Sequence, residues 1–174
     1  MTSIKTTLLA GFAVFALTLP AFAQAGLDDL EVAHAAYTAD VIDIEYAKLA
    51  LSKTKNPEVK KFAELMIRDH TAVNEGAGAL LKKLGVQAKD NDFSKALLKG
   101  FEAKKKELSA LDGAAFDRAY AANELAYHQT VNKIVGETWI PTVKNAELKA
   151  FLSQALVTFK AHENHAGHMV TAAK

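Results

Sequence analysis

The stretch NPEVKKFAELMIRDHTAVN, residues 56–74, decides how the chain is expected to fold. Asn56 is a good helix cap and Pro57 suits the first turn of a helix, so one helix ends and another begins here with almost no connection. Two helices that are joined so closely lie antiparallel and side by side. The second helix is expected to end at about Leu84, where Gly85 stops it. Apolar residues at helical spacing form its inward stripe: Phe62, Met66, Val73, Leu80 and Leu84.

The first helix is expected to run from about Asp28 to Lys53. Alanine, leucine, lysine and glutamate dominate the whole chain and only three prolines occur, so helices are predicted almost throughout. In the first helix, apolar residues at three- and four-residue spacing predict one buried stripe. These residues are Leu30, Tyr37, Val41, Ile44 and Leu51.

The C-terminal half predicts three further helical segments. Residues 86–111 hold a polar run and then a lysine-rich amphipathic piece, which we expect to form a short helix across the outside, with its lysines in water. A third main helix opens at Asp112 or Gly113, and a loop around residues 139–141 leads to the fourth, at about residues 146–172. The predicted fold is therefore all-α: a four-helix bundle with two hairpins and one long connection between helices two and three.

The N-terminus has the features of a secretory signal peptide. One positive charge, Lys5, precedes an apolar run of about a dozen residues, and Ala21 and Ala23 bracket a small-residue cleavage site. The run is too short to remain as a membrane anchor, which needs about 20 residues. We expect a signal peptide over residues 1–23 and one mature domain over residues 24–174, exported to the periplasm without stable membrane insertion.

Charge and cysteine content exclude several functions. The chain has 21 Lys and Arg against 20 Asp and Glu, and loss of Lys5 with the signal peptide balances the two. Such a chain offers no basic stripe for nucleic acid. It has no cysteine, so disulfides and thiolate sites are excluded, and a bound metal needs His, Asp or Glu ligands.

Three pieces carry a resemblance to a known family: NPEVKKFA at 56–63, FAELMIRDHTAVN at 62–74 and SALDGAAFDRAYAANELAYH at 109–128. Over nearly the whole mature chain, the sequence resembles the exported bacterial family catalogued as domain of unknown function 4142 (DUF4142), which is ferritin-like in fold. The resemblance implies a helical bundle with a crossover between helices two and three, and no settled activity. It places the family's polar positions on Asp43, Asp69, His70, His128 and His162.

Helical spacing independently points two histidines into the bundle. His70 shares the stripe of Met66, and His162 lies between Phe159 and Ala166, so both rings face the core. A buried polar group without a partner costs about 1 to 3 kcal/mol. The buried imidazoles therefore need partners inside the bundle.

Carboxylates on other helices could supply those partners. Asp40 and Asp43 share a small-residue face of helix one, and Glu124 and His128 lie four apart on helix three. A rise of about 1.5 Å per residue places these groups and His70 at a similar depth, with His162 roughly 5 to 10 Å away. Inward polar residues at a common depth on four helices are typical of metal sites in bundles. The predicted ligands are Asp40, Asp43, His70, Glu124, His128 and His162.

The pattern favours zinc or copper over iron. Di-iron bundles use Glu-x-x-His on two helices, whereas Ile67, Leu125 and Phe159 stand three residues before the inward histidines. Imidazole-rich sites suit zinc and copper. We expect a metal-binding protein, in metal handling or stress protection, rather than an enzyme. The alternatives are a metal-free interaction or envelope-stress protein with a buried polar network, and an oxidase that uses metal and dioxygen. Oligomeric state stays open, a homodimer included.

The last helix also carries two histidines beyond the predicted centre. At helical spacing, His165 falls at the edge of the inward stripe and His168 lies well round toward solvent. We expect only His162 to belong to the central site, and His165 and His168 to form part of a solvated helix end.

Overall fold

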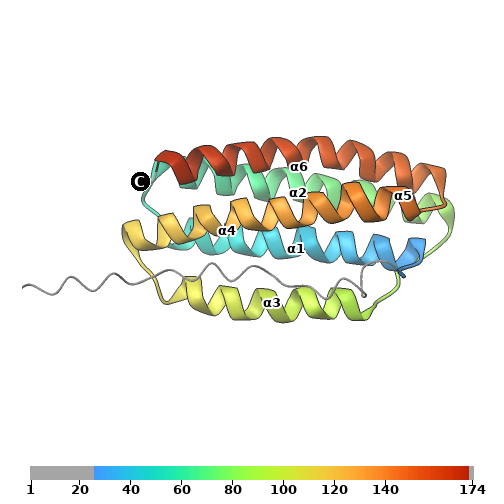
Figure 1. The fold of residues 1–174 in the computed structure, drawn as a ribbon, viewed down its shortest axis with the longest axis horizontal. Helices are drawn as coiled ribbons and strands as arrows, with labels where there is room; N and C mark the ends of the chain where they lie inside the picture. Colours follow the sequence, from blue (N-terminus) through green and yellow to red (C-terminus); the bar gives the residue numbers. More distant parts are fainter. Residues whose placement is uncertain (1–25, 173–174) are drawn as a thin grey trace, which may run out of the picture.

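The computed structural model describes residues 26–172. Within these residues the chain is helical without strands, which confirms the predicted all-α class. The predicted signal peptide and its cleavage site lie outside the described residues. Five long helices run along the molecule (Figure 1). Their bounds are Asp29–Lys53 (α1), Pro57–Leu84 (α2), Asp92–Ser109 (α3), Gly113–Ile134 (α4) and Ala146–Ala172 (α6).

Capping residues fix the ends of α1 and α2 where the sequence placed them. The Asp28 carboxylate accepts from the backbone N–H groups of Leu30 and Glu31, and Glu31 accepts from the Asp28 N–H in return. Asn56 caps α2 by accepting from the N–H of the second following residue, at 2.9 Å. Gly85 closes α2 with a φ of 70°, a left-handed conformation that favours glycine.

The helices α1, α2, α4 and α6 surround one core. The α1–α2 and α4–α6 pairs are hairpins, while α2 contacts α6 and α1 contacts α4. At the α1–α2 connection, the Thr54 hydroxyl donates to Asp117 at 2.6 Å, and Lys53 pairs with Asp112 at 2.9 Å. The start of α4 therefore lies beside the start of α2. This is the arrangement that places His128 at a depth similar to that of His70.

The helix α3 returns the chain from one end of the molecule to the other (Figure 1). The sequence predicted a short helix across the outside, and this was wrong: α3 has 18 residues and lies alongside α1 and α4. Four of its apolar residues are buried over this length, which a helix crossing at an angle would not allow. They are Phe93, Leu97, Phe101 and Leu108.

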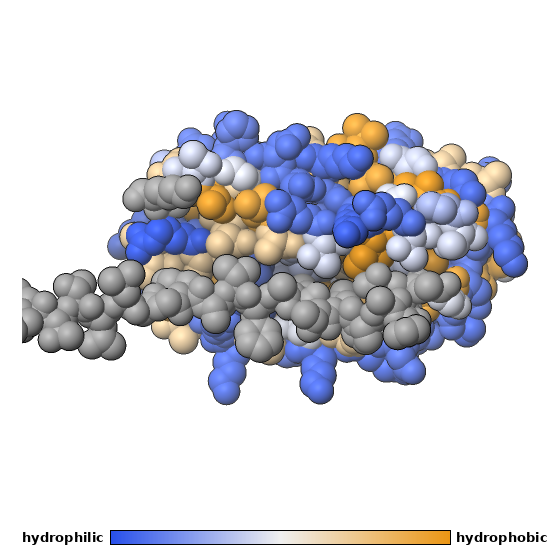
Figure 2. All heavy atoms as spheres, viewed as in Figure 1, coloured by the Kyte–Doolittle hydropathy of each residue, from blue (hydrophilic) through white to orange (hydrophobic). Residues whose placement is uncertain are grey.

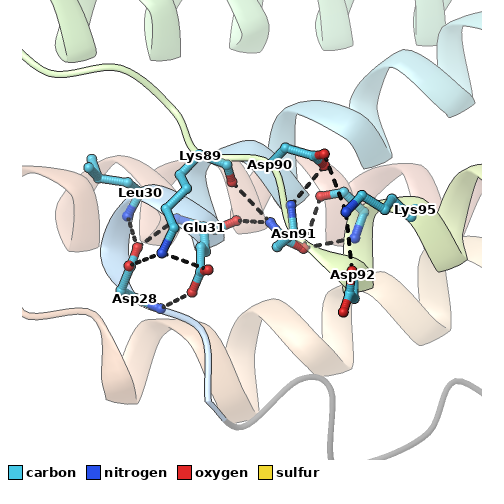
Figure 3. Close-up of polar contacts among 9 residues, drawn as sticks. Asp28, Leu30, Glu31, Lys89, Asp90, Asn91, Asp92 and Lys95 are labelled. Atoms are coloured by element: carbon cyan, nitrogen blue, oxygen red, sulfur yellow. Dashed lines mark hydrogen bonds and ion pairs between the residues drawn. The ribbon is translucent and has the colours of Figure 1, made fainter.

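Polar contacts hold the start of α3 against the start of α1 (Figure 3). Lys89 pairs with Asp28 at 3.0 Å and with Glu31 at 2.9 Å. Asn91 caps α3 by accepting from the Ser94 N–H at 2.8 Å, and its amide donates to the Glu31 carbonyl at 3.0 Å. The long connection is thus tied to α1 before α3 begins.

The buried face of α1 differs from the apolar stripe that the sequence predicted. Tyr37, expected in the core, is 49% exposed, and the other four residues of that stripe are only half-buried. The small-residue face is the one that turns inward, with Asp40, Asp43 and Ala47 all buried. The reason is that α1 contacts α2, α3 and α4, so most of its circumference is covered and the apolar pattern no longer marks one face.

The predicted loop around residues 139–141 is helical instead. A π-helical turn, Val135–Trp139, continues α4 and leads directly into α5, Ile140–Thr142. Pro141 lies in the first turn of α5, a position that proline tolerates. The N–H groups of Lys144 and Asn145 then donate to the Asp29 carboxylate, which joins the start of α6 to the start of α1.

Hydrophilic residues cover most of the face in Figure 2, with apolar residues in small groups between them. Among residues 26–172, no helix combines the length and the apolar character that a membrane span requires.

Candidate metal centre

All six residues predicted to form the centre are buried, each 4% exposed or less. Four helices position them: α1 contributes two aspartates, α2 a histidine, α4 a glutamate and a histidine, and α6 a histidine. They are Asp40, Asp43, His70, Glu124, His128 and His162.

Three imidazole rings form a triangle in the core. The ring centroids of His70 and His128 are 5.8 Å apart, those of His70 and His162 are 5.3 Å apart, and those of His128 and His162 are 5.5 Å apart. The rise per residue placed His162 roughly 5 to 10 Å from the other groups. In the structure its ring lies beside the other two, so this estimate was too large.

The Asp43 carboxylate lies next to two of these rings. Its Oδ2 atom is 3.4 Å from His70 Nε2 and 3.3 Å from His128 Nε2. A tetrahedral zinc ion with bonds of about 2.0–2.1 Å keeps neighbouring ligand atoms roughly 3.3 Å apart. Each of these two nitrogens therefore lies as far from Asp43 Oδ2 as two ligands of one small cation lie from each other.

The outer nitrogen of each ring is held by a hydrogen-bond acceptor. His70 Nδ1 lies 2.7 Å from Asp40 Oδ1, and His162 Nε2 lies 2.9 Å from Asp69 Oδ2. His128 Nδ1 donates to the Glu124 main-chain carbonyl at 2.9 Å, because a carbonyl can only accept. Such contacts on the outer nitrogen leave the inner nitrogen of a neutral ring with its lone pair, which is the arrangement of metal-binding histidines.

The inner atoms have no such partners. Among the residues that the structure describes, six buried donor or acceptor atoms of the centre lack a hydrogen bond. Each buried polar atom without a partner costs about 1 to 3 kcal/mol, so a ligand that contacted several of these atoms would offset a substantial cost. The atoms are both oxygens of Asp43, His70 Nε2, Glu124 Oε2, His128 Nε2 and His162 Nδ1.

The pKa values of the buried groups are shifted in different directions, and burial lowers the pKa of His128 although Asp43 lies beside it. Burial works to lower the pKa of His70, but the charges of Asp43 and Asp40 outweigh it and raise this pKa to about 9. At His162, burial prevails and lowers the pKa to about 4. Burial raises the pKa of the Glu124 carboxyl well above its usual range, and the charge of Asp43 adds to the effect.

Two groups of three residues have ligand atoms within 4.8 Å of one another. One group is the three histidines, and the other is Asp43, Glu124 and His128. Aromatic rings enclose the centre: Phe159 stacks on His70 at 4.8 Å, and Phe62 packs edge-on to His128 at 6.4 Å. The centre thus combines side chains that could hold a cation with aromatic rings packed against two of its imidazoles.

Sequence reasoning missed the role of Asp69. Helical spacing did not include this residue among the predicted ligands, and only the family resemblance named it as a polar position. In the structure one Asp69 oxygen pairs with Arg68 at 2.7 Å, and the other lies 2.9 Å from His162 Nε2. The histidines at the end of α6 behave as the sequence predicted: His165 is half-buried against Phe62, and His168 is exposed. Only His162 of this helix joins the centre.

Comparison with known proteins identifies a family for the chain. The family model described as Domain of unknown function (DUF4142) matches residues 16–169, a range that includes every residue of the centre. No curated protein and no solved structure matches the chain.

Proposed function

The chain belongs to the DUF4142 family, and from this premise we propose that it is an exported protein that binds one divalent metal ion in the core of a ferritin-like four-helix bundle. The ligands in this proposal are Asp43, His70, His128 and His162. Export to the periplasm is proposed from the sequence pattern of residues 1–23. The observation that supports metal binding is the cluster of buried polar atoms without hydrogen-bond partners among the described residues. Four of the residues in this cluster supply the proposed ligands.

The remaining candidates act around the four ligands. Asp40 binds the outer nitrogen of His70, so we assign it to hold and polarise that ring rather than to touch the ion. Asp69 does the same for His162. Glu124 is a weaker, additional ligand, because burial keeps its carboxyl protonated until a cation displaces the proton.

Zinc or copper fits this ligand set better than iron does. Three imidazole nitrogens and one carboxylate suit zinc and copper, whereas the two-iron sites of bundles rest mainly on glutamates. A protein that carries such an ion in the periplasm would serve metal handling or protection from metal stress.

A metal-free protein with a buried polar network is the second candidate. The specific observation in its favour is that His70 already carries a raised pKa between two aspartates, which would satisfy part of the network without an ion. It leaves His162 Nδ1 and Glu124 Oε2 without hydrogen-bond partners among the described residues.

Elemental analysis of untagged protein separates the two candidates. We expect close to one zinc or copper ion per chain, lost in a His70→Ala/His128→Ala double variant and kept in His168→Ala, whose histidine is exposed. Protein that purifies without metal, and whose melting temperature does not change when zinc, copper or ferrous iron is added, would support the polar network and overturn the proposal.

A further inference from the structure

Because every proposed ligand is buried, an ion needs a route through the bundle wall. We propose that divalent cations enter and leave through the groove between α2 and α6, by way of Asp69 and then His162. This inference rests on the proposed metal-binding function and names the path by which the ion reaches and leaves its ligands. The groove encloses about 280 Å³. Its lining residues are Asp69, Ala72, Val73, Phe151, Gln154, Ala155 and Thr158.

Asp69 is the point where this groove meets the centre. It is the one charged residue among those that line the groove, and its side chain is 20% exposed. The side chains of Asp43, His70 and His128 are 5% exposed or less. A hydrated cation in the groove therefore meets a carboxylate before it meets any proposed ligand.

His162 continues the path inward. Its Nε2 atom lies 2.9 Å from Asp69, and its Nδ1 atom, on the other side of the ring, is buried without a hydrogen-bond partner among the described residues. The ring centroid of His162 lies 5.3 Å from that of His70. The Asp69 carboxylate, the His162 ring and the ligand triangle thus follow one another from the groove to the core.

Arg68 controls the outer end of this path. Its Nε atom donates to Asp69 Oδ1 at 2.7 Å, and its side chain is 72% exposed, so it can move away without unpacking the core. An incoming cation competes with this guanidinium for the carboxylate. Removal of the Arg68 charge should consequently speed uptake.

A second groove, between α1 and α2, provides the matched control. Thr71, Glu75 and seven further residues line it, and none of them is a proposed ligand or bonds to one. Gln154 in the first groove and Thr71 in the second are both exposed. An arginine at either position adds the same charge to the surface at a similar helical site.

The test is stopped-flow uptake of Zn²⁺ by wild-type protein, Gln154→Arg, Thr71→Arg and Arg68→Ala at low ionic strength, with release measured into excess chelator. We expect Gln154→Arg to slow uptake and release together, roughly three- to tenfold, with the Kd nearly unchanged, because the added charge raises the barrier and leaves the bound state alone. Thr71→Arg should match wild type, and Arg68→Ala should take up Zn²⁺ faster.

Equal slowing by both arginine variants, or no slowing by Gln154→Arg, would overturn the α2–α6 route while leaving metal binding intact. Failure of the wild-type protein to bind Zn²⁺ would overturn the proposed function, and the route with it.

Discussion

Asp40 holds the outer nitrogen of His70 at 2.7 Å, and both residues are buried where α1 and α2 meet. This one contact fixes how the ring is turned. It directs Nε2 toward Asp43, which approaches it at 3.4 Å from the same helix as Asp40. Two aspartates that are three residues apart on α1 therefore lie next to the two nitrogens of one ring. Asp40 lies at the outer nitrogen, Nδ1, and Asp43 at the inner nitrogen, Nε2.

The first prediction concerns the contact between Asp40 and His70. Asp40→Asn should weaken zinc binding roughly 10- to 100-fold, because the amide keeps a hydrogen-bond acceptor for His70 but loses the charge that makes the ring a stronger ligand. Competition against a chelator of known affinity measures the effect. Glu45→Gln, a matched change on α1 at a carboxylate that pairs with Lys48 near the surface, should leave zinc binding unchanged. Equal zinc affinity in Asp40→Asn and wild type would contradict the assigned role.

The second prediction is that bound zinc stabilises the fold. An ion that binds only the folded state adds about 2.7 kcal/mol to the free energy of unfolding at 100 times its Kd. For a domain of this size, that corresponds to a rise in Tm of about 5 to 10 °C. Differential scanning calorimetry with and without zinc measures it. His128→Ala should remove the rise, and His168→Ala should keep it; a similar rise in both variants would place zinc outside the centre.

Much of the fold and of this centre could be predicted because local signals were strong. Asn56, Pro57 and Gly85 mark helix ends through backbone chemistry that acts within a few residues. The inward position of His70 and His162 follows from their place among apolar neighbours, and burial of both is confirmed. The depth of His128 was predicted from the rise per residue together with the crossover that the family resemblance implies, and the contact of Thr54 with Asp117 confirms that α4 starts at that end.

The failures arose where tertiary contacts decide. The apolar spacing on α1 predicted that Tyr37 is buried, yet the neighbouring helices α2, α3 and α4 leave this side chain exposed. The sequence of α1 alone does not indicate which of its sides these helices cover. Trp139 and Pro141 suggested a loop because the sequence alone does not distinguish a proline in the first turn of a helix from one that ends it. The contact between Asp69 and His162 was not predicted, because it joins residues that are 93 positions apart in the sequence.

The third prediction concerns the contact that joins the end of α1 to the first turns of α4. Thr54→Val should lower the free energy of unfolding by about 1 kcal/mol, because it removes the 2.6 Å hydrogen bond to the buried Asp117 carboxylate and also the acceptor of the Asn56 N–H at 3.0 Å. Urea unfolding followed by circular dichroism measures the change. The same substitution at exposed Thr71 should alter stability by less than about 0.5 kcal/mol. A Thr54→Val variant as stable as Thr71→Val would show that this bond contributes nothing to the α1–α4 arrangement.

The fourth prediction is a dependence of stability on pH from the start of α1. Hydrogen bonds from the Glu31 backbone N–H and from Lys89 lower the pKa of Asp28 below its ordinary value of 3.8 in the folded protein. A carboxyl whose pKa is depressed by folding contributes stability above its unfolded pKa and loses it as the pH falls through its folded pKa. Asp28→Asn keeps a good helix cap without the charge. The urea midpoint of wild type should therefore exceed that of Asp28→Asn near pH 7, and the gap should narrow as the pH falls below the ordinary pKa of 3.8 and through the lower pKa of the folded protein. A gap that stays constant from pH 7 to pH 2.5 would mean that the carboxylate charge, with its contacts to Glu31 and Lys89, does not stabilise the start of α1.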